Sequence, residues 1–278
     1  MTQYVLSPRQ LSSFRQFGFL RLEGFFDAGT VASLEAEVRA QLASAYDLPT
    51  EIPDVVTGSM GYYLPLMGEG SATSRRLVAG PRLVELGEAL LDGPVMPKPA
   101  KGMLYNDASP WHRDAAAPAL RAVKMVTYFS ALTADSGALR VIPGSHRGEF
   151  SDRLTDYRAA WPLDSPLDEA GEADWWPGTS LDCRPGDLIV FDVRLWHASL
   201  FGRLRAQWSV SYVAVPETEA ERRAAHDYID LFLQAGHEYD AERFPYYDPD
   251  WSKTDGPAFA EAMADLGLIR VDGAAAAD

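Results

Sequence analysis

Cysteine is almost absent from this chain of 278 residues, in which Cys183 is the only one. A single cysteine excludes an intramolecular disulfide and any zinc cluster built from cysteines. Nothing in the surrounding segment LDCRPGD indicates an activated thiol. We therefore expect Cys183 to be a packed small side chain rather than a nucleophile.

Long apolar runs and positive charge are also scarce. No stretch approaches the length that spans a bilayer, and the opening MTQYVLSPRQ has no basic segment followed by an apolar one. Lys and Arg number 25 against 40 Asp and Glu, a net charge of −15. That sign repels nucleic-acid phosphates and anionic lipids, and it argues against a CoA thioester as substrate. We expect a cytoplasmic protein that binds neither nucleic acid nor membranes.

The remaining composition is that of an ordinary globular protein, with 47% apolar and 23% charged residues. One elaborated β-rich domain can absorb this length without a second core. The expected single domain has N-terminal helices and a loop over 1–94, a β core over 95–216 and a helical, aromatic-rich extension over 217–278.

Local patterns predict helices before the β core. Ser7 and Gln10 are spaced as a capping box around a helix that begins at Pro8, and Gly18 ends that helix. A strand is predicted from residue 19, then an amphipathic helix over 27–44. From 95 to 215 the chain has short apolar runs separated by Gly, Pro and Asp, which is typical of a sandwich or barrel.

The segment SPWHRDAAAP contains a His-X-Asp pair, His112 and Asp114. Alternate side chains of an extended segment share a face, so these two point the same way. His197, near the end of GDLIVFDVRLWHAS, can supply a third ligand from a neighbouring strand, and two histidines with one carboxylate form the facial site of non-haem Fe(II) oxygenases. A lone His-X-Asp pair is common by chance, and His146 in PGSH is a rival ligand.

Three motifs, WHRDAA, SGALRVIPGSHRGEF and PGDLIVFDVRLWHASLFG, together resemble the phytanoyl-CoA dioxygenase-like family of Fe(II)/2-oxoglutarate oxygenases. The likeness extends over roughly residues 7 to 216. It implies a mainly β protein with flanking helices (α+β), built on a double-stranded β-helix: a jelly-roll, cupin-like core.

The same resemblance implies that His112, Asp114 and His197 bind Fe(II) and act as the catalytic centre, with 2-oxoglutarate and O2 as cosubstrates. Ser199 matches the hydroxyl that assists binding of 2-oxoglutarate. Arg205 is the better match for the arginine that holds its distal carboxylate, although Arg203 stays open because the spacer after the histidine is short. Further contacts to 2-oxoglutarate are expected from Thr127 and Tyr105.

The function predicted in this way is oxidation, above all hydroxylation, of a C–H bond in a small-molecule metabolite, with release of succinate and CO2. Two alternatives stay open: a cupin-like metal-dependent isomerase or hydrolase that ignores 2-oxoglutarate, and a non-catalytic binding protein on the same fold. The substrate and the oligomeric state are not predicted. Five aromatic residues either line the pocket or pack the added segments: Tyr62, Tyr63, Tyr246, Tyr247 and Trp251. Three charged residues are candidate substrate contacts: Arg113, Lys124 and Arg140.

Overall fold

The structure is a computed structural model, and it describes residues 4–48, 61–105, 108–161, 175–202, 204–235, 238–254 and 256–269. Arg203 and most of the predicted loop before Gly61 lie outside these ranges. The helices are α1 (Pro8–Phe17), α2 (Ala28–Tyr46), α3 (Ala72–Val78), α4 (Pro81–Leu91), α5 (Gly148–Ala160), α7 (Glu219–Gln234), α8 (Pro249–Thr254) and α9 (Pro257–Asp265). The strands are β1 (Phe19–Leu22), β2 (Gly61–Pro65), β3 (Val95–Tyr105), β4 (Ser109–His112), β5 (Ala122–Tyr128), β6 (Leu139–Val141), β7 (Thr179–Ser180), β8 (Leu188–Asp192), β9 (His197–Ser199) and β10 (Arg205–Ala214).

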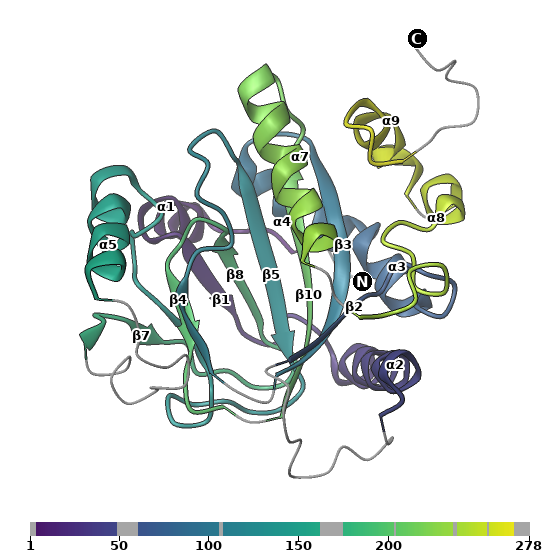
Figure 1. The fold of residues 1–278 in the computed structure, drawn as a ribbon, viewed down its shortest axis with the longest axis horizontal. Helices are drawn as coiled ribbons and strands as arrows, with labels where there is room; N and C mark the ends of the chain where they lie inside the picture. The colour runs from purple at the N-terminus through teal and green to yellow at the C-terminus, as the bar shows by residue number, and fades with distance from the viewer. Residues whose placement is uncertain are drawn as a thin grey trace.

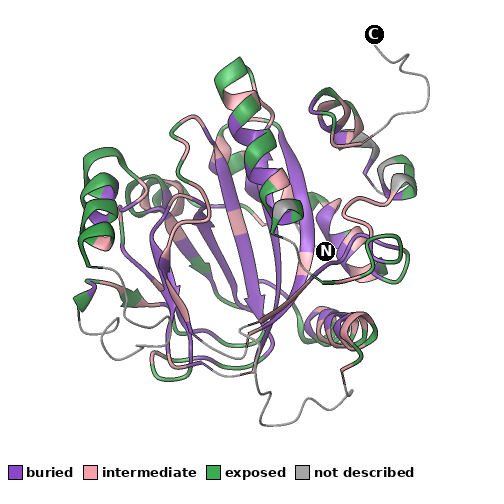
Figure 2. Ribbon diagram, viewed as in Figure 1, coloured by how far each residue is buried: buried purple, intermediate pink, exposed green. Residues whose placement is uncertain are grey.

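The strands form two antiparallel sheets, one of six strands in the order β1-β8-β5-β10-β3-β2 and one of four in the order β4-β9-β6-β7. Figure 1 shows the sheets with helices around them, and Figure 2 shows that the strands are mostly buried. A cluster of apolar side chains, among them Tyr128 and Phe191, joins the two sheets from inside. The predicted jelly roll with flanking helices is confirmed.

The N-terminal helix follows its predicted boundaries. Ser7 accepts from the backbone N–H of Gln10, whose side chain in turn accepts from the backbone N–H of Ser7. Gly18 ends α1 with φ of 84°, the left-handed conformation that glycine adopts without a steric penalty. The strand β1 then begins at the next residue and pairs with β8 at the edge of the larger sheet.

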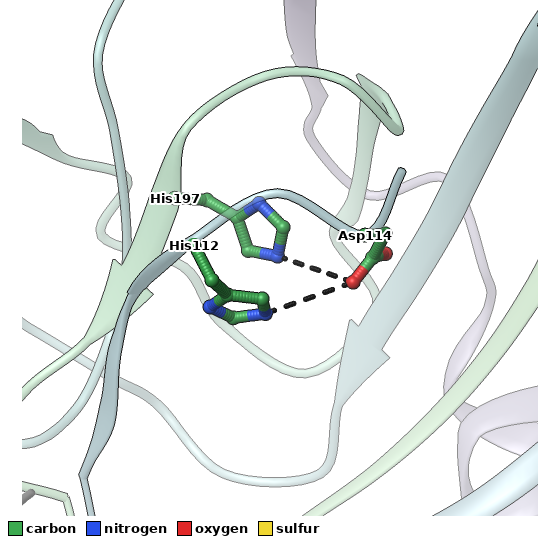
Figure 3. A group of neighbouring side chains, drawn as sticks. All are labelled: His112, Asp114 and His197. Atoms are coloured by element: carbon green, nitrogen blue, oxygen red, sulfur yellow. Dashed lines mark ion pairs between the residues drawn. The ribbon is translucent and has the colours of Figure 1, made fainter. Parts of the chain in front are cut away.

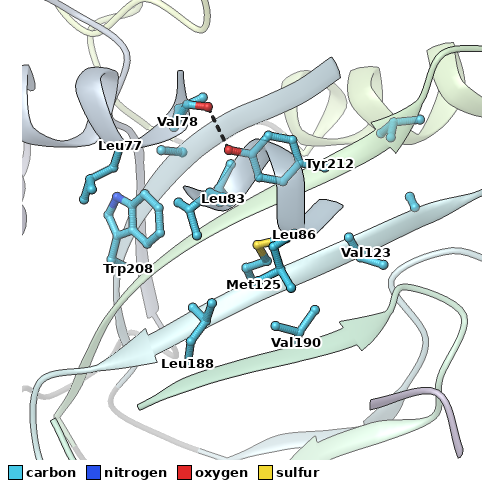
Figure 4. Close-up of a cluster of buried hydrophobic side chains, with 14 of the residues drawn as sticks. Leu77, Val78, Leu83, Leu86, Val123, Met125, Leu188, Val190, Trp208 and Tyr212 are labelled. Atoms are coloured by element: carbon cyan, nitrogen blue, oxygen red, sulfur yellow. Dashed lines mark hydrogen bonds between the residues drawn. The ribbon is translucent and has the colours of Figure 1, made fainter. Parts of the chain in front are cut away.

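Helices α2 and α4 cover the outer face of the six-stranded sheet. Side chains of β10 point alternately to the inner and the outer face of the sheet, and those on the outer face pack under these helices (Figure 4). Trp208 is fully buried and its indole N–H donates to Ser74 Oγ at 2.9 Å, while Tyr212 donates to the carbonyl of Val78 at 2.7 Å. Both polar tips therefore have partners, as burial of Trp and Tyr requires.

The last part of the described chain packs on the outside of the barrel. Tyr246 and Tyr247 donate to the carbonyls of Ile229 and Pro97, and Trp251 is fully buried with its indole N–H on the carbonyl of Arg75. These three aromatics anchor the extension rather than line a pocket. Among the described residues, no helix combines the length and apolar character of a membrane span.

Cys183 lies among apolar side chains between the sheets, and 6% of its surface is exposed. Burial raises the pKa of its thiol to about 11, so almost none of it is thiolate at pH 8. We expect native protein to resist alkylation by iodoacetamide at pH 8 for hours and protein unfolded in urea to react within minutes. Mass spectrometry of the intact chain measures the difference, and equal rates in both states would contradict the buried placement.

Candidate active site

The two predicted histidines come from paired strands. His112 is the last residue of β4, His197 is the first of β9, and the antiparallel register places them directly opposite each other. Asp114 follows β4 by two residues and turns back toward both rings (Figure 3). Its Oδ1 lies 3.7 Å from His112 Nε2 and 3.6 Å from His197 Nε2. The structure thus brings the three predicted ligands together, with one ligand atom of each within 4.8 Å of the others.

Both histidine rings are oriented in the same way by the backbone. His112 Nδ1 lies 2.7 Å from the carbonyl oxygen of Pro110, and His197 Nδ1 lies 2.8 Å from that of Leu195. A carbonyl only accepts, so each Nδ1 carries the proton and each Nε2 presents its lone pair to the site. Such a hydrogen bond on the far nitrogen is what fixes the tautomer and direction of a metal-binding histidine.

Lys124 of β5 orients the carboxylate. Its ammonium lies 2.9 Å from Asp114 Oδ2, which leaves Oδ1 for the histidine side. Burial alone raises the pKa of Asp114, but Lys124 and then the two histidines outweigh it and hold that pKa well below its usual range. Burial, and next the neighbouring His112, lower the pKa of His197. The site therefore presents a carboxylate and neutral imidazole, the protonation states that coordinate a metal.

This donor set fits Fe(II). Two imidazole nitrogens and one carboxylate oxygen on one face of an octahedral ion leave three positions for other ligands. Among the described residues, these three form the one group of histidine, cysteine or carboxylate side chains that lie close enough to one another to hold a metal ion. His146, the rival from the sequence, follows a turn beside Gly18 and is not part of the group.

The three residues open into a cavity of about 330 Å³ between the sheets. Arg205, Ser199 and Tyr105, three of the four residues predicted to contact 2-oxoglutarate, also line it. Arg205 is 2% exposed; its guanidinium donates to Ser199 Oγ and, at 3.2 Å, to the carbonyl of Gly137, and lies 5.2 Å from the centre of the Tyr105 ring. A cationic, planar group is thus fixed at one end of the cavity.

Two glycines make room for that guanidinium. A Cβ added to Gly137 would lie 2.5 Å from the Arg205 side chain, and one added to Gly202 would lie 2.1 Å from it. Gly137 also has φ of 91°, which other residues rarely adopt. Because neither residue has a side chain, the guanidinium of Arg205 fits against both positions without a clash.

Thr127 is the predicted contact that the structure does not bring to the cavity. Side chains of β5 alternate between the two faces of the sheet, and Lys124, Val126 and Tyr128 take the inner one. Thr127 points to the opposite face, is fully buried, and donates to the carbonyl of Asp187 at 2.9 Å. The prediction for Thr127 was one residue out of phase.

Of the charged candidate substrate contacts, Lys124 lines the cavity, whereas Arg113 and Arg140 do not. Arg113 donates to Ser151 and Thr155 of α5, and Arg140 donates to the carbonyl of Ala134. Of the aromatic candidates, Tyr63 on β2 lines the cavity, whereas Tyr62 packs against Tyr46.

Polar side chains of β10 and residues of α7 also line the cavity, beyond those predicted from the sequence. On β10 the inward residues are all polar, and they alternate with the apolar outward set in RAQWSVSY, a pattern legible in the sequence. Helix α7 also contributes to the lining, and in Figure 1 it crosses in front of β5 and β3. The additional lining residues include Lys98, Lys101, Gln207, Ser209, Ser211, Tyr228, Leu231, Phe232 and Ala235.

Known proteins share this fold. The ectoine dioxygenase of Sphingopyxis alaskensis is 28% identical over 218 residues, which cover 70% of each chain. The crystal structure of HygX from Streptomyces hygroscopicus with nickel and 2-oxoglutarate bound is similar with a TM-score of 0.60 at 19% identity, over 76% of this chain and 88% of HygX. EctD from S. alaskensis, solved with 2-oxoglutarate and 5-hydroxyectoine, has a TM-score of 0.55 at 23% identity, over 76% and 77% of the two chains.

The jelly roll and its site of two histidines and one carboxylate define a non-haem Fe(II)- and 2-oxoglutarate-dependent dioxygenase. The family model for phytanoyl-CoA dioxygenase (PhyH) matches residues 14–201. The chain belongs to the phytanoyl-CoA dioxygenase family.

Proposed function

We propose that this protein hydroxylates a C–H bond of a small-molecule metabolite and releases succinate and CO2 from 2-oxoglutarate. The observation that carries the proposal is that the metal-binding group and the buried Arg205 with Ser199 face one cavity. A cupin-like isomerase or hydrolase that ignored 2-oxoglutarate would have no use for that cationic end.

In this proposal His112, Asp114 and His197 would hold Fe(II), which supplies the oxidation chemistry when bound. Arg205 grips the distal carboxylate of 2-oxoglutarate, because a planar guanidinium pairs with a carboxylate through two parallel hydrogen bonds. Ser199 positions that guanidinium and adds a hydroxyl beside it. Tyr105 lies against the guanidinium and limits the access of water to it.

Asp114 bears on the kind of oxidation. A site without the carboxylate ligand would leave a further position open on the metal, which chloride could fill. Here Asp114 is present and is held between the two histidines and Lys124. Hydroxylation is therefore preferred to halogenation.

The test is formation of succinate by the purified protein. With Fe(II), ascorbate, O2 and 2-oxoglutarate we expect slow succinate formation even without a substrate, and none when Fe(II) is removed by a chelator or 2-oxoglutarate is left out. Chromatography of succinate measures it. Because the relative from Sphingopyxis alaskensis is named an ectoine dioxygenase, ectoine is the first substrate to add. Metal-dependent conversion of a substrate without any use of 2-oxoglutarate would overturn the proposal and favour the isomerase or hydrolase. The cytoplasmic location stays a prediction.

A further inference from the structure

Two lysines share the inner face of β3 because the strand contains a bulge. Lys98 and Lys101 are three residues apart, so in a regular strand they would point to opposite faces. The pairing of β3 with β10 runs from Lys101 opposite Ser209 to Lys98 opposite Ser211, so three steps on β3 match two on β10. The extra residue turns Lys98 back inward, and both lysines line the cavity.

Helix α7 holds both ammonium groups from the other side. Lys98 Nζ lies 3.9 Å from the centre of the Tyr228 ring and donates to the carbonyl of Tyr228. Lys101 Nζ lies 3.9 Å from the centre of the Phe232 ring. Aromatic faces attract cations, so the rings position the lysines without neutralising them. Within the described ranges, neither lysine forms a salt bridge with a carboxylate.

The cavity is lined mainly by basic side chains although the chain as a whole is strongly negative. Its lining contains Lys98, Lys101, Lys124 and Arg205 against one carboxylate, Asp114, while the net charge of the chain is −15. Asp114 is already paired with Lys124. Burial lowers the pKa of Lys98 to about 7 and that of Lys101 well below its usual range, so an anion bound between them would favour the charged form of both lysines.

The lysines also lie away from the end assigned to 2-oxoglutarate. Arg205 pairs with Tyr105, and Lys101 lies four residues further along β3, a span of about 13 Å. Lys98 and Lys124 flank Ser211 on either side, so their strands are roughly 10 Å apart. An anion held by Lys98 and Lys101 would therefore lie further along β3 than one held by Arg205, in the same cavity as the metal-binding group.

We propose that Lys98 and Lys101 form an anion subsite that binds a carboxylate or phosphate group of the substrate, with its apolar part against Tyr228 and Phe232. This assignment rests on the proposed function, and it narrows the substrate to a small acidic molecule. The aromatic side chains of α7 then do two things: they position the ammonium groups and contact the substrate.

The test uses small aromatic anions and measures binding rather than turnover. Benzoate, phenyl phosphate and the neutral benzamide are titrated by ligand-observed NMR into the wild-type protein saturated with 2-oxoglutarate, so that the Arg205 end is filled. We expect at least one anion to bind ten times or more tightly than benzamide. Whichever of benzoate and phenyl phosphate binds better indicates whether the substrate group is a carboxylate or a phosphate.

The matched variants are Lys98→Met and Lys101→Met, which keep the length and remove the charge, with Lys101→Arg as the conservative form. We expect each Met variant to weaken anion binding about tenfold and Lys101→Arg to retain it. Lys253→Met, on the exposed surface of α8, is the control for loss of a lysine outside the cavity. Melting temperatures identify a variant that has not folded.

Two results would overturn the subsite. One is equal binding of the anions to folded wild type, Lys98→Met and Lys101→Met. The other is a tenfold or larger rise, in Lys101→Met, of the 2-oxoglutarate concentration that gives half-maximal succinate formation, because it would assign the lysine to the cosubstrate. If the wild type forms no succinate while anion binding still depends on the lysines, the proposed function fails and the subsite stands.

Discussion

Replacing His112 with alanine is expected to abolish succinate formation. His112 supplies one of three ligands, its Nε2 is directed into the site by the hydrogen bond to Pro110, and His197 and Asp114 alone leave an incomplete face. Loss of a partner that merely supports a metal ligand costs about 10- to 100-fold in affinity or activity. Loss of a ligand should exceed that, so we expect Fe(II) binding to weaken by more than about 100-fold.

Metal content after dialysis and succinate formation measure this effect. His226→Ala is the matched control, because His226 is an exposed histidine of α7 that lies beside Asp227, outside the metal-binding group. The control should bind metal and form succinate as the wild type does. Wild-type succinate formation by folded His112→Ala would remove the metal assignment.

Replacing Arg205 with leucine is expected to raise the 2-oxoglutarate concentration for half-maximal succinate formation by about 100-fold. Truncating one partner of a buried, hydrogen-bonded charge pair costs roughly 2–5 kcal/mol, and each 1.4 kcal/mol is a factor of ten. Arg205 is almost completely buried at the cavity end, where few waters can replace it. Arg205→Lys should fall between wild type and leucine, because an ammonium cannot pair with both oxygens in a plane.

Two comparisons make the Arg205 experiment decisive. Arg203→Leu tests the other arginine that the sequence offers, and Arg140→Leu removes a partly buried arginine that donates to the carbonyl of Ala134 instead of lining the cavity. Neither should change the dependence on 2-oxoglutarate by more than about twofold, because the proposal assigns the distal carboxylate to Arg205 and Arg140 does not line the cavity. A large effect in Arg203→Leu and none in Arg205→Leu would transfer the role to Arg203.

Several features could be predicted because they depend on neighbours in the chain. The capping box of Ser7 with Gln10 and the stop at Gly18 are local hydrogen-bonding and backbone effects, and both are found where the pattern places them. His112 and Asp114 share a face because of the period of an extended segment. The polar residues of β10 that face the cavity follow from the same period, because polar and apolar side chains alternate in RAQWSVSY.

Which face of a sheet a side chain points to, and where a strand contains a bulge, could not be predicted from local sequence. Thr127 was expected at the cavity, but the register of β5 gives the inner face to Lys124, Val126 and Tyr128. A shift of one residue moves every side chain of a strand to the other face, and nothing within a short strand fixes that choice. The bulge in β3, which brings Lys98 to the same face as Lys101, depends on pairing with β10.

By itself the sequence determined the chemistry of the site: a His-X-Asp pair, a later histidine, and an arginine with a serine beside it, in an order that resembles one family of oxygenases. Only the tertiary structure decided what else faces that chemistry. In the folded protein Lys124 pairs with Asp114, Lys98 points into the cavity and α7 lines it. The C-terminal aromatic residues, among them Tyr247, pack on the outside of the barrel. The physical reason is that ligand type follows from residue identity, whereas neighbours across strands and helices follow from register and packing over long separations in the chain.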